Sequence, residues 1–269
     1  MIISDYLEKK LLDMFLHNTA YTAPANLYIG MFTADPGESG VTGEFPIGTG
    51  AYARAVVANN ATNFPLCSTV AVPVKTNGTT IAWPTATTAW GTATHWAVFD
   101  ASTGATNMLA HGPLTAPWTV ASGSTPKIVA GAFSLSASNA AGGGMTNFAQ
   151  RKALDLVFGA AAYTSPSAVF VGLGTALSGE TITEWADTAA LRTTVAFNAA
   201  TLGDGTSPNS ANTAIATTAT PATLTHYGIW DASTAGNLLF VGPLESSRTV
   251  ASPDTVNLAD SASIVVTLQ

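Results

Sequence analysis

The most telling absence in this sequence is charge. Only 9% of its 269 residues are charged, against about 25% in an average soluble domain. Nine Lys and Arg stand against sixteen Asp and Glu, a net charge of −7, and the basic residues form no cluster. Because phosphate neutralisation needs clustered Lys and Arg, we expect the protein not to bind nucleic acid.

Cysteine and long apolar runs are missing as well. Cys67 is the only cysteine, which excludes an intrachain disulfide or a thiolate metal cluster. It follows the run Phe-Pro-Leu and is expected to be a small buried apolar side chain. No segment approaches the roughly 20 consecutive apolar residues of a membrane helix, so we expect no membrane insertion. The first ten residues lack the pattern of a secretion signal and are expected to belong to the folded chain.

In place of these features the sequence contains an internal duplication. Ala20–Pro24 reads AYTAP and returns at 162–166 as AYTSP, and Thr94–Thr103 reads THWAVFDAST and returns at 225–234 as THYGIWDAST. The landmarks keep one order, and length changes fall only in the middle of the copies, as expected of loops on a shared scaffold. Tandem duplication of one domain is therefore predicted.

The domain boundaries follow from this duplication. We predict a first domain at residues 1–138, a linker at residues 139–146 and a second, diverged domain at residues 147–269. The linker region includes the small-residue run SNAAGGG, which has no apolar period. Each copy has a size that is common for one domain with its own core and is far longer than a solenoid repeat.

Each copy is predicted to begin with an amphipathic helix and to continue in β-strands. From Ser4 or Asp5, the expected N-cap, apolar residues recur at helical spacing up to Leu16, and residues 147–158 repeat the pattern. Beyond Pro24 the apolar residues follow period two or form short runs rich in Thr, Val and aromatic residues. The fold class is therefore mainly β: two tandem antiparallel β-sandwich or barrel domains, each opened by one helix.

Two aspartates are the most tempting catalytic carboxylates in the sequence. Asp100 and Asp231 each follow an aromatic residue and begin a predicted hairpin turn, where Asp usually accepts hydrogen bonds from backbone N–H groups two residues on. His95 lies five residues before Asp100, and odd spacing in a strand places two side chains on opposite faces. We therefore expect turn capping and not acid–base catalysis, and we expect His95 and His226 to be structural.

Acid–arginine pairs recur in both copies. Glu44 precedes Arg54, and Glu184 precedes Arg192 at a similar distance. An ion pair that fixes a loop on the following strand would explain this recurrence. We therefore predict a structural role for these four residues.

The remaining polar motifs indicate no catalytic, cofactor or metal site. Asp35, Glu38 and Glu44 could hold a surface cation, but a solvated loop is the expected structure. The sequence contains no nucleophile elbow, no HExxH zinc motif, no phosphate-binding glycine loop and no calcium loop. We therefore do not expect an enzyme.

Six tryptophans raise the question of sugar binding. Exposed Trp or Tyr on a β-sandwich can stack on sugar rings, whereas aromatic residues in alternating strands usually pack in the core. Trp96, Tyr227 and Trp230 are the candidate contact aromatics, since they lie in the matching strand segments of the two copies. Core packing is the expectation for most of the six, with glycan contact as the alternative.

The order of these motifs resembles a family of small bacteriophage virion proteins that are often labelled tail-fibre proteins. The first copy carries nearly the whole pattern, over residues 6–138, whereas the second lacks Trp-Gly-Thr and keeps only Leu191-Arg192 of Tyr-Ala-Arg. In the first copy the pattern reads Leu12-Asp13, Tyr21-Thr22-Ala23-Pro24, Gly43-Glu44, Tyr52-Ala53-Arg54, Trp90-Gly91-Thr92-Ala93-Thr94-His95-Trp96, Phe99-Asp100-Ala101 and Gly112-Pro113-Leu114. The resemblance implies a virion structural protein.

The position on the particle is argued from the layout of the sequence. A trimeric fibre shaft usually has long repetitive sequence, and this chain has two globular copies on a short linker. We expect it to decorate or cement a capsid surface through protein–protein contacts, with the major capsid protein or tail proteins, and other copies of itself, as partners. The alternative is a tail-associated adhesin that binds a host surface glycan. In both cases the protein would belong to the virion and be assembled in the host cytoplasm.

Overall fold

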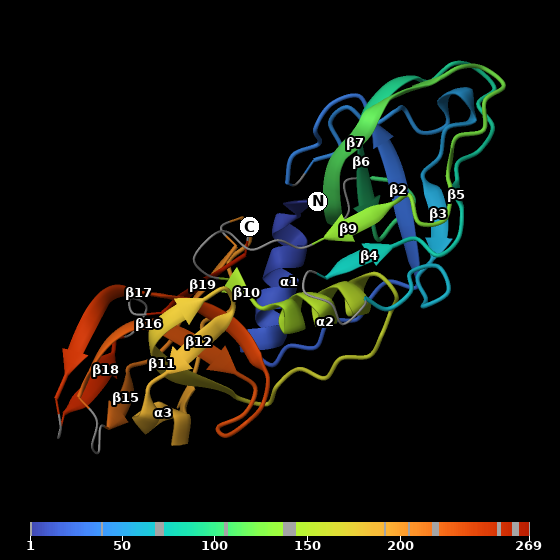
Figure 1. Cartoon of the computed structure of the whole chain (residues 1–269). Helices are drawn as coiled ribbons and strands as arrows, with labels where there is room; N and C mark the ends of the chain where they lie inside the picture. The colour runs from blue at the N-terminus through green and yellow to red at the C-terminus, as the bar shows by residue number, and fades with distance from the viewer. Residues whose placement is uncertain are drawn as a thin grey trace. The chain divides into compact units, whose positions relative to one another are not determined.

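The computed structural model describes residues 2–38, 40–67, 73–104, 107–136, 144–190, 192–203, 205–216, 221–251, 254–259 and 264–268. They form two compact units (Figure 1), and each unit includes segments from both halves of the sequence. Unit 1 comprises Met1–Glu8, Thr22–Ala137 and Arg151–Tyr163, and unit 2 comprises Lys9–Tyr21, Ser138–Gln150 and Thr164–Gln269. The junction between the duplicated sequences at 138 and 147 stays a prediction, and residues 139–143 of its linker lie outside the described residues.

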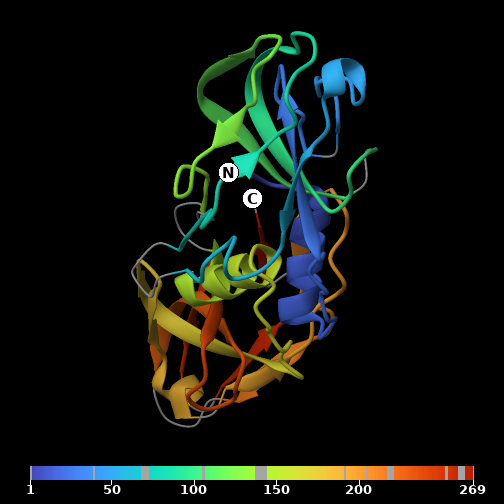
Figure 2. The same ribbon diagram turned by 90° about the vertical axis from the view of Figure 1, so that its right-hand side faces the viewer.

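Unit 1 is built on one antiparallel sheet with the strand order β1-β7-β6-β2-β3. Figures 1 and 2 show β2, in blue, beside the green strand β6, which β7 flanks on its other side. Two short antiparallel pairs, β4–β9 and β5–β8, complete the unit. The strands are β1 (Ile2–Ile3), β2 (Asn26–Phe32), β3 (Ala55–Ala58), β4 (Val74–Thr76), β5 (Ile81–Ala82), β6 (Gly91–Phe99), β7 (Met108–Val120), β8 (Lys127–Ile128) and β9 (Ser134–Ser136), with a 3-10 turn at Thr49–Ala51.

Unit 2 repeats this plan. Its large sheet has the order β10-β17-β16-β11-β12, and β13 pairs with β11 as β3 pairs with β2. The short pairs are β14–β19 and β15–β18. The elements are β10 (Gly144–Met145), β11 (Val169–Ser178), β12 (Thr181–Glu184), α3 (Ala186–Ala190), β13 (Thr193–Val195), β14 (Thr206–Pro208), β15 (Thr213–Ala216), β16 (Ala222–Trp230), β17 (Leu238–Val250), β18 (Thr255–Leu258) and β19 (Val265–Thr267).

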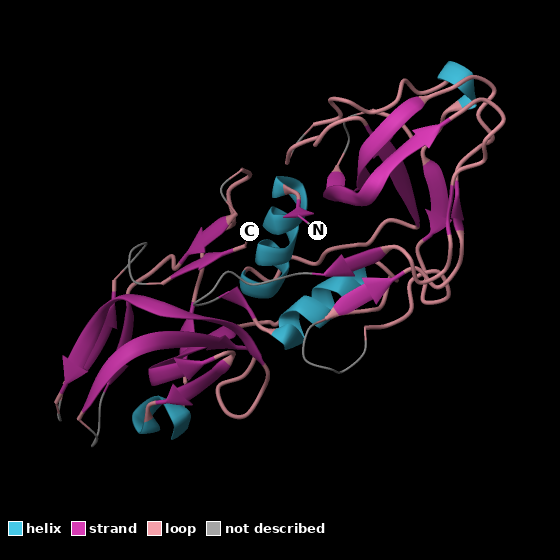
Figure 3. Cartoon of the chain, turned by 45° about the horizontal axis from the view of Figure 1, so that its top comes forward, coloured by secondary structure: helices cyan, strands magenta, loops and turns pink. Residues whose placement is uncertain are grey.

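The mainly β class with one helix opening each copy is confirmed, as the magenta strands and few cyan helices of Figure 3 show. The large sheets end in separate edge strands, so they are open and not closed barrels. Ala93 of β6 pairs with Trp118 of β7, and His95 pairs with Pro113, so β7 has more residues than β6 between these two pairs. This irregularity, which tolerates proline in a strand, recurs in β17 of unit 2.

The two long helices, α1 (Asp5–Leu16) and α2 (Asn147–Val157), begin in the same way. The Ser4 hydroxyl accepts a hydrogen bond from Leu7 N at 3.3 Å, and the Thr146 hydroxyl accepts one from Ala149 N at 3.4 Å. Each capping residue also donates its own backbone N–H to the long hairpin strand of its unit, Ser4 to β7 and Thr146 to β17. Ser4 is therefore the N-cap of α1, which satisfies one of the free N–H groups of the helix.

An aspartate in each helix binds a backbone N–H group of a loop. Asp155 of α2, which belongs to unit 1, accepts from Cys67 N at 2.8 Å and from Lys75 Nζ at 2.6 Å. Lys75 is fully buried. Burial first, and then the nearby Asp155, raise the pKa of the Cys67 thiol to about 12. The cysteine is therefore buried, as predicted, and protonated at neutral pH.

The equivalent aspartate of α1 belongs to unit 2. Asp13 accepts from Ala200 N at 2.8 Å, and Lys9 Nζ bridges Asp13 and the Ala200 carbonyl at 2.7 Å each. Here the lysine is 31% exposed. Phe15, two residues further along, packs edge-on against Phe240 with ring centroids 5.8 Å apart. The Leu-Asp motif of each copy therefore joins its helix to a loop of the unit in which that part of the helix lies.

Candidate functional site

The predicted acid–arginine pairs lie in the interior of the two units. In unit 1, Arg54 Nε and Nη2 each lie 2.8 Å from an oxygen of Glu44, and the two side chains are 0% and 8% exposed. In unit 2, Arg192 Nε and Nη2 lie 2.9 and 3.0 Å from the oxygens of Glu184. This two-bond geometry is the strongest form of an arginine–carboxylate contact.

Each arginine also holds the turn of the long hairpin in its unit. Arg54 donates to the carbonyls of Ala101 and Gly104 at 2.9 Å each, and its guanidinium carbon lies 3.6 Å from the centroid of the Phe99 ring. Arg192 donates to Ala235 O at 2.6 Å and lies 3.9 Å from the Trp230 ring centroid. We call the glutamate, the arginine and the turn carbonyls of each unit its arginine clamp.

Asp100 and Asp231, the candidate catalytic carboxylates, lie in the hairpin turns that the arginines hold. Asp100 accepts a hydrogen bond from the Asn107 side chain at 2.7 Å. Asp231 accepts from the backbone N–H of Asn237 at 2.6 Å and from its side chain at 2.7 Å. Both carboxylates therefore bridge the two ends of a hairpin turn, and the clamp arginine binds carbonyls of the same turn.

Two glycines that the sequence analysis did not single out make room for the clamp carboxylates. A Cβ at Gly30 would lie 2.8 Å from Glu44 Oε1. A Cβ at Gly172 would collide with Glu184 Oε1 and lie 2.8 Å from Cζ3 of Trp230. Both glycines stand at matching places in the first apolar strand of each copy, a recurrence that marks the two positions without indicating this role.

We expect Gly172→Ala to lower the stability of unit 2 by about 1–3 kcal/mol, because the added methyl group must displace a buried carboxylate or an indole. Gly30→Ala should cost less, because its nearest contacts, 2.8 Å to Glu44 Oε1 and 3.0 Å to Phe32 Cε2, are longer than those at Gly172. The measurement is urea denaturation of the full chain, with Ser178→Ala, an exposed site near the end of β11, as the control. A denaturation midpoint that is equal for Gly172→Ala and Ser178→Ala would show that the close approach has no energetic weight.

The clamps are tied to their sheets through different hydroxyl groups. In unit 1, Met31 N donates to the Tyr52 hydroxyl at 2.8 Å, which in turn lies 3.2 Å from Glu44 Oε1. Burial first, and then the Glu44 charge, raise the pKa of Tyr52 far above its ordinary value, so the phenol stays a donor. In unit 2, Thr188 of α3 takes over the contact to the strand and accepts from Leu173 N at 3.2 Å.

The candidate contact aromatics are buried. Trp96 is 7% exposed, Tyr227 5% and Trp230 5%. The Trp96 ring packs edge-on against Phe133, and burial raises the pKa of the Tyr227 phenol to about 12. Trp90 and Trp118, the other tryptophans with partly accessible surfaces, pack against Tyr52 and Trp83. Sugar stacking at Trp96, Tyr227 or Trp230 would require these side chains to leave the core.

The histidines and the acidic loop are placed as follows. His95 and His226 are half-buried and contact the hydroxyl of the preceding threonine at 2.9 and 2.7 Å. Asp35 and Glu38 face His111 in unit 1. Glu44 is bound to Arg54, so it does not converge with the other two carboxylates on a cation. No group of three metal-ligating side chains is found among the described residues.

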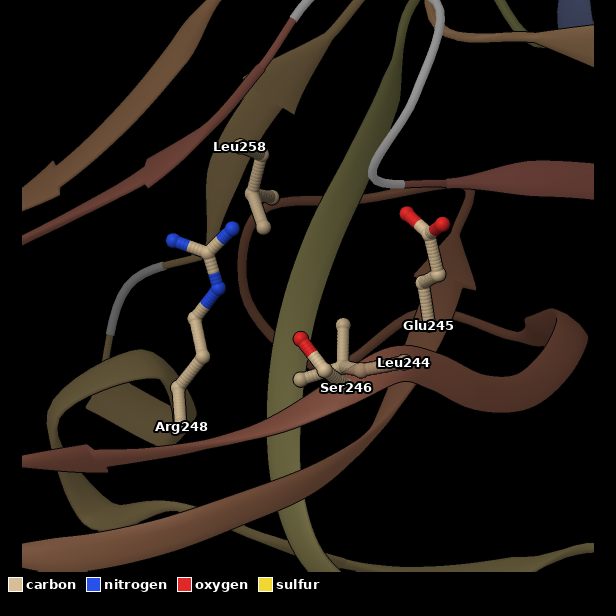
Figure 4. A pocket seen from close by; sticks show the side chains of 5 residues that line it. All are labelled: Leu244, Glu245, Ser246, Arg248 and Leu258. Carbon is tan, nitrogen blue, oxygen red and sulfur yellow. The ribbon is translucent and has the colours of Figure 1, made fainter.

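A small hollow lies on unit 2, between β17 and β18. Figure 4 shows the side chain of Arg248 pointing toward Leu258, with Glu245 on the opposite side of the hollow. Arg248 Nη1 donates to Asn257 O at 2.9 Å. The space holds no more than about one water molecule. It marks a divergence between the copies, because Trp118 occupies the position of Arg248 in unit 1.

Comparison with known protein families decides the assignment. The model of the family described as "Podophage GP4 fiber I protein gp80" matches residues 2–136 and 144–267. The chain belongs to this family. Comparison with curated proteins gave no match.

The gp80 fibre family matches each copy separately, which confirms the resemblance to phage fibre-like proteins and the tandem duplication. Membership makes the chain a bacteriophage virion structural protein. The family supports a fibre-like role and leaves the predicted capsid decoration unconfirmed. No described helix is both long and apolar enough to cross a membrane.

Proposed function

We propose that the protein is a structural component of a virion fibre and acts through protein–protein contacts, without catalysis. The observation that carries this proposal is the duplicated arginine clamp. The acid–arginine pairs that recur in both copies, Arg54 with Glu44 and Arg192 with Glu184, hold hairpin turns. The ion pairs retained in both copies therefore make the hairpins rigid, as a structural protein of the particle requires.

The surface fits dense packing against other protein. Charged residues are few, and exposed threonines pair across the long hairpins, Thr92 with Thr119 and Thr223 with Thr249. A sparsely charged, hydroxyl-rich surface repels neighbouring subunits weakly. The partners we propose are tail or capsid proteins of the same virion and further copies of this chain, brought together during assembly in the host cytoplasm.

Capsid decoration is the second candidate, and the burial of the aromatic residues favours it over a glycan-binding adhesin. Trp96, Tyr227 and Trp230 are all at most 7% exposed. Sugar-binding sites on β-sandwiches need exposed rings. A decoration protein would use the same neutral surface on the head that a fibre component uses on the tail.

The copy number in purified virions separates these two candidates. A fibre component is expected at a few to a few tens of copies, set by the symmetry of the tail, and gold-labelled antibody should bind at the fibres in electron micrographs. The number is measured by quantitative mass spectrometry against the major capsid protein. Hundreds of copies, with label over the whole head, would overturn the fibre assignment and establish decoration.

A further inference from the structure

Unit 1 binds the C-terminal end of α2 through a buried asparagine. Asn59 is 6% exposed and contacts α2 through both polar atoms of its side chain. Its Nδ2 donates to Val157 O at 2.9 Å, and its Oδ1 accepts from Gly159 N at 2.6 Å. The last carbonyls of a helix have no partner within the helix, and Asn59 supplies a donor to one of them.

Two further contacts hold the same end of α2. Asp155 accepts from Cys67 N and from Lys75 Nζ. The rings of Phe158 and Phe64 pack with their centroids 6.4 Å apart, and each residue is 1% exposed. Hydrogen bonds and apolar packing therefore act together on the segment from 155 to 159. The helix-receiving surface of unit 1, as we call it, comprises Asn59, Phe64, Cys67 and Lys75.

Gly159 makes this surface selective. Its φ is 139°, a backbone conformation that glycine adopts readily and residues with a side chain adopt rarely. A Cβ at this position would lie 2.9 Å from Phe64 O and 3.1 Å from Lys75 Nζ. The carbonyl belongs to the backbone and cannot turn aside as a flexible side chain can. The surface therefore accepts a helix that is followed by glycine at this place.

The helix of the first copy does not meet this requirement. His17 stands where α2 has Gly159 when the two Leu-Asp motifs are aligned, and an imidazole has no room beside Phe64 O. The C-terminal part of α1 lies instead in unit 2, where Asp13 accepts from Ala200 N. The strands of the first copy are thus completed by the helix of another copy of the domain.

We propose that the helix-receiving surface of unit 1 also binds the α2 helix of a second copy of this chain, so that chains associate by exchanging this helix. Every chain carries the same Leu-Asp helix followed by Phe158 and Gly159. A helix from a neighbouring chain makes the same hydrogen bonds as the chain's own, which is why exchange of an identical element is a low-cost route to association.

Concentration decides between the two sources of the helix. A helix on the same chain has an effective concentration of about 1 mM, so exchange is expected where chains are crowded, as in a growing fibre. This inference rests on the self-association that we propose for the protein. It names the surface and the segment through which one copy recognises another.

The test is complementation between two full-length variants. Gly159→His gives α2 the residue of α1 and should leave the surface of that chain without a fitting helix. Asn59→Ala removes both side-chain contacts from the surface and leaves α2 unchanged. In a mixture, α2 of the Asn59→Ala chain should occupy the surface of the Gly159→His chain. At about 100 µM of each, we expect the heterodimer seen by native mass spectrometry to exceed the dimer of either variant alone by at least about tenfold.

The matched control mixes Gly159→His with the double variant Asn59→Ala, Gly159→His, which offers no fitting helix and should give no heterodimer. The proposal is overturned if the two single variants stay monomeric in the mixture, or if the control forms as much heterodimer as they do. Hydrogen exchange in β2 and β6 checks that each chain is folded. Should Gly159→His lose this protection, Gly159→Ala takes its place, because its methyl group meets the same carbonyl. The copy number in virions has no part in this result, so failure of the exchange and failure of the fibre assignment are distinguished.

Discussion

Replacing Asp155 with alanine is expected to lower the free energy of unfolding of unit 1 by about 3–5 kcal/mol, the cost of leaving one charge of a buried pair without its partner. Lys75 has 0% of its side chain exposed, and Asp155 Oδ1 lies 2.6 Å from its Nζ. The same oxygen accepts the backbone N–H of Cys67. The change therefore leaves the Lys75 ammonium group and the Cys67 N–H buried without this hydrogen-bond acceptor.

The equivalent residue in unit 2 is a matched control for this prediction. Asp13→Ala removes the acceptor of Ala200 N, but its lysine partner Lys9 is 31% exposed and can turn to solvent. We expect a loss of about 1–3 kcal/mol, from the unpaired N–H group alone. Chemical denaturation gives the totals, and hydrogen exchange assigns each loss to a unit, as a chain of two units requires.

A double variant shows whether the loss of stability in Asp155→Ala comes from the unpaired charge of Lys75. Lys75→Met combined with Asp155→Leu should recover part of the stability that Asp155→Ala loses, because it removes both charges and keeps apolar volume. If Asp155→Ala is no more destabilising than Asp13→Ala, the buried pair makes no special contribution. Reduced protection in the strands of unit 2 instead of unit 1 would also contradict the structure, since Asp155 contacts only residues of unit 1 in the hydrogen bonds described above.

Arg54→Lys is the second change with a large expected effect, a loss of about 2–4 kcal/mol despite the retained charge. Arginine satisfies Glu44 through two bonds and the carbonyls of Ala101 and Gly104 through two more. A lysine ammonium cannot reach all these acceptors or stack in a plane over Phe99. Buried acceptors are then left unsatisfied.

Hydrogen exchange at the turn identifies the cause of this loss. In Arg54→Lys the amides of residues 100–104 should lose protection before those of β2. Arg192→Lys should cost less, because its pair with Glu184 is more exposed, 9% and 13%. Arg248→Lys, which gives up one bond to a backbone carbonyl, should cost at most about 1 kcal/mol. Equal losses for all three substitutions would mean that the clamp geometry is not what stabilises the hairpin.

A good part of this molecule can be predicted from residues that recur. The matching segments around His95 and His226 predict duplication, and the family match to both copies confirms it. Alternation in the strands predicts a β fold, because side chains on a pleated strand alternate between two faces. The recurrence of a glutamate shortly before an arginine, Glu44 with Arg54 and Glu184 with Arg192, indicates an ion pair in each copy.

Other parts depend on contacts that no local pattern encodes. Gly30 and Gly172 read as ordinary strand glycines until the carboxylates above them are seen. His111 has no counterpart in the second copy, so recurrence could not single it out. Its partners Asp35 and Glu38 are more than 70 positions away in the sequence.

The amino-acid sequence by itself determined the duplication, the β class, the opening helices and the phage family. Only the tertiary structure decided that Asp13 serves unit 2 and Asp155 serves unit 1. The physical reason is that an apolar stripe specifies which face of a helix is buried, but not the surface that buries it. Each copy offers a loop, after β3 or after β13, to the same Leu-Asp motif, and chain connectivity and long-range packing choose between them.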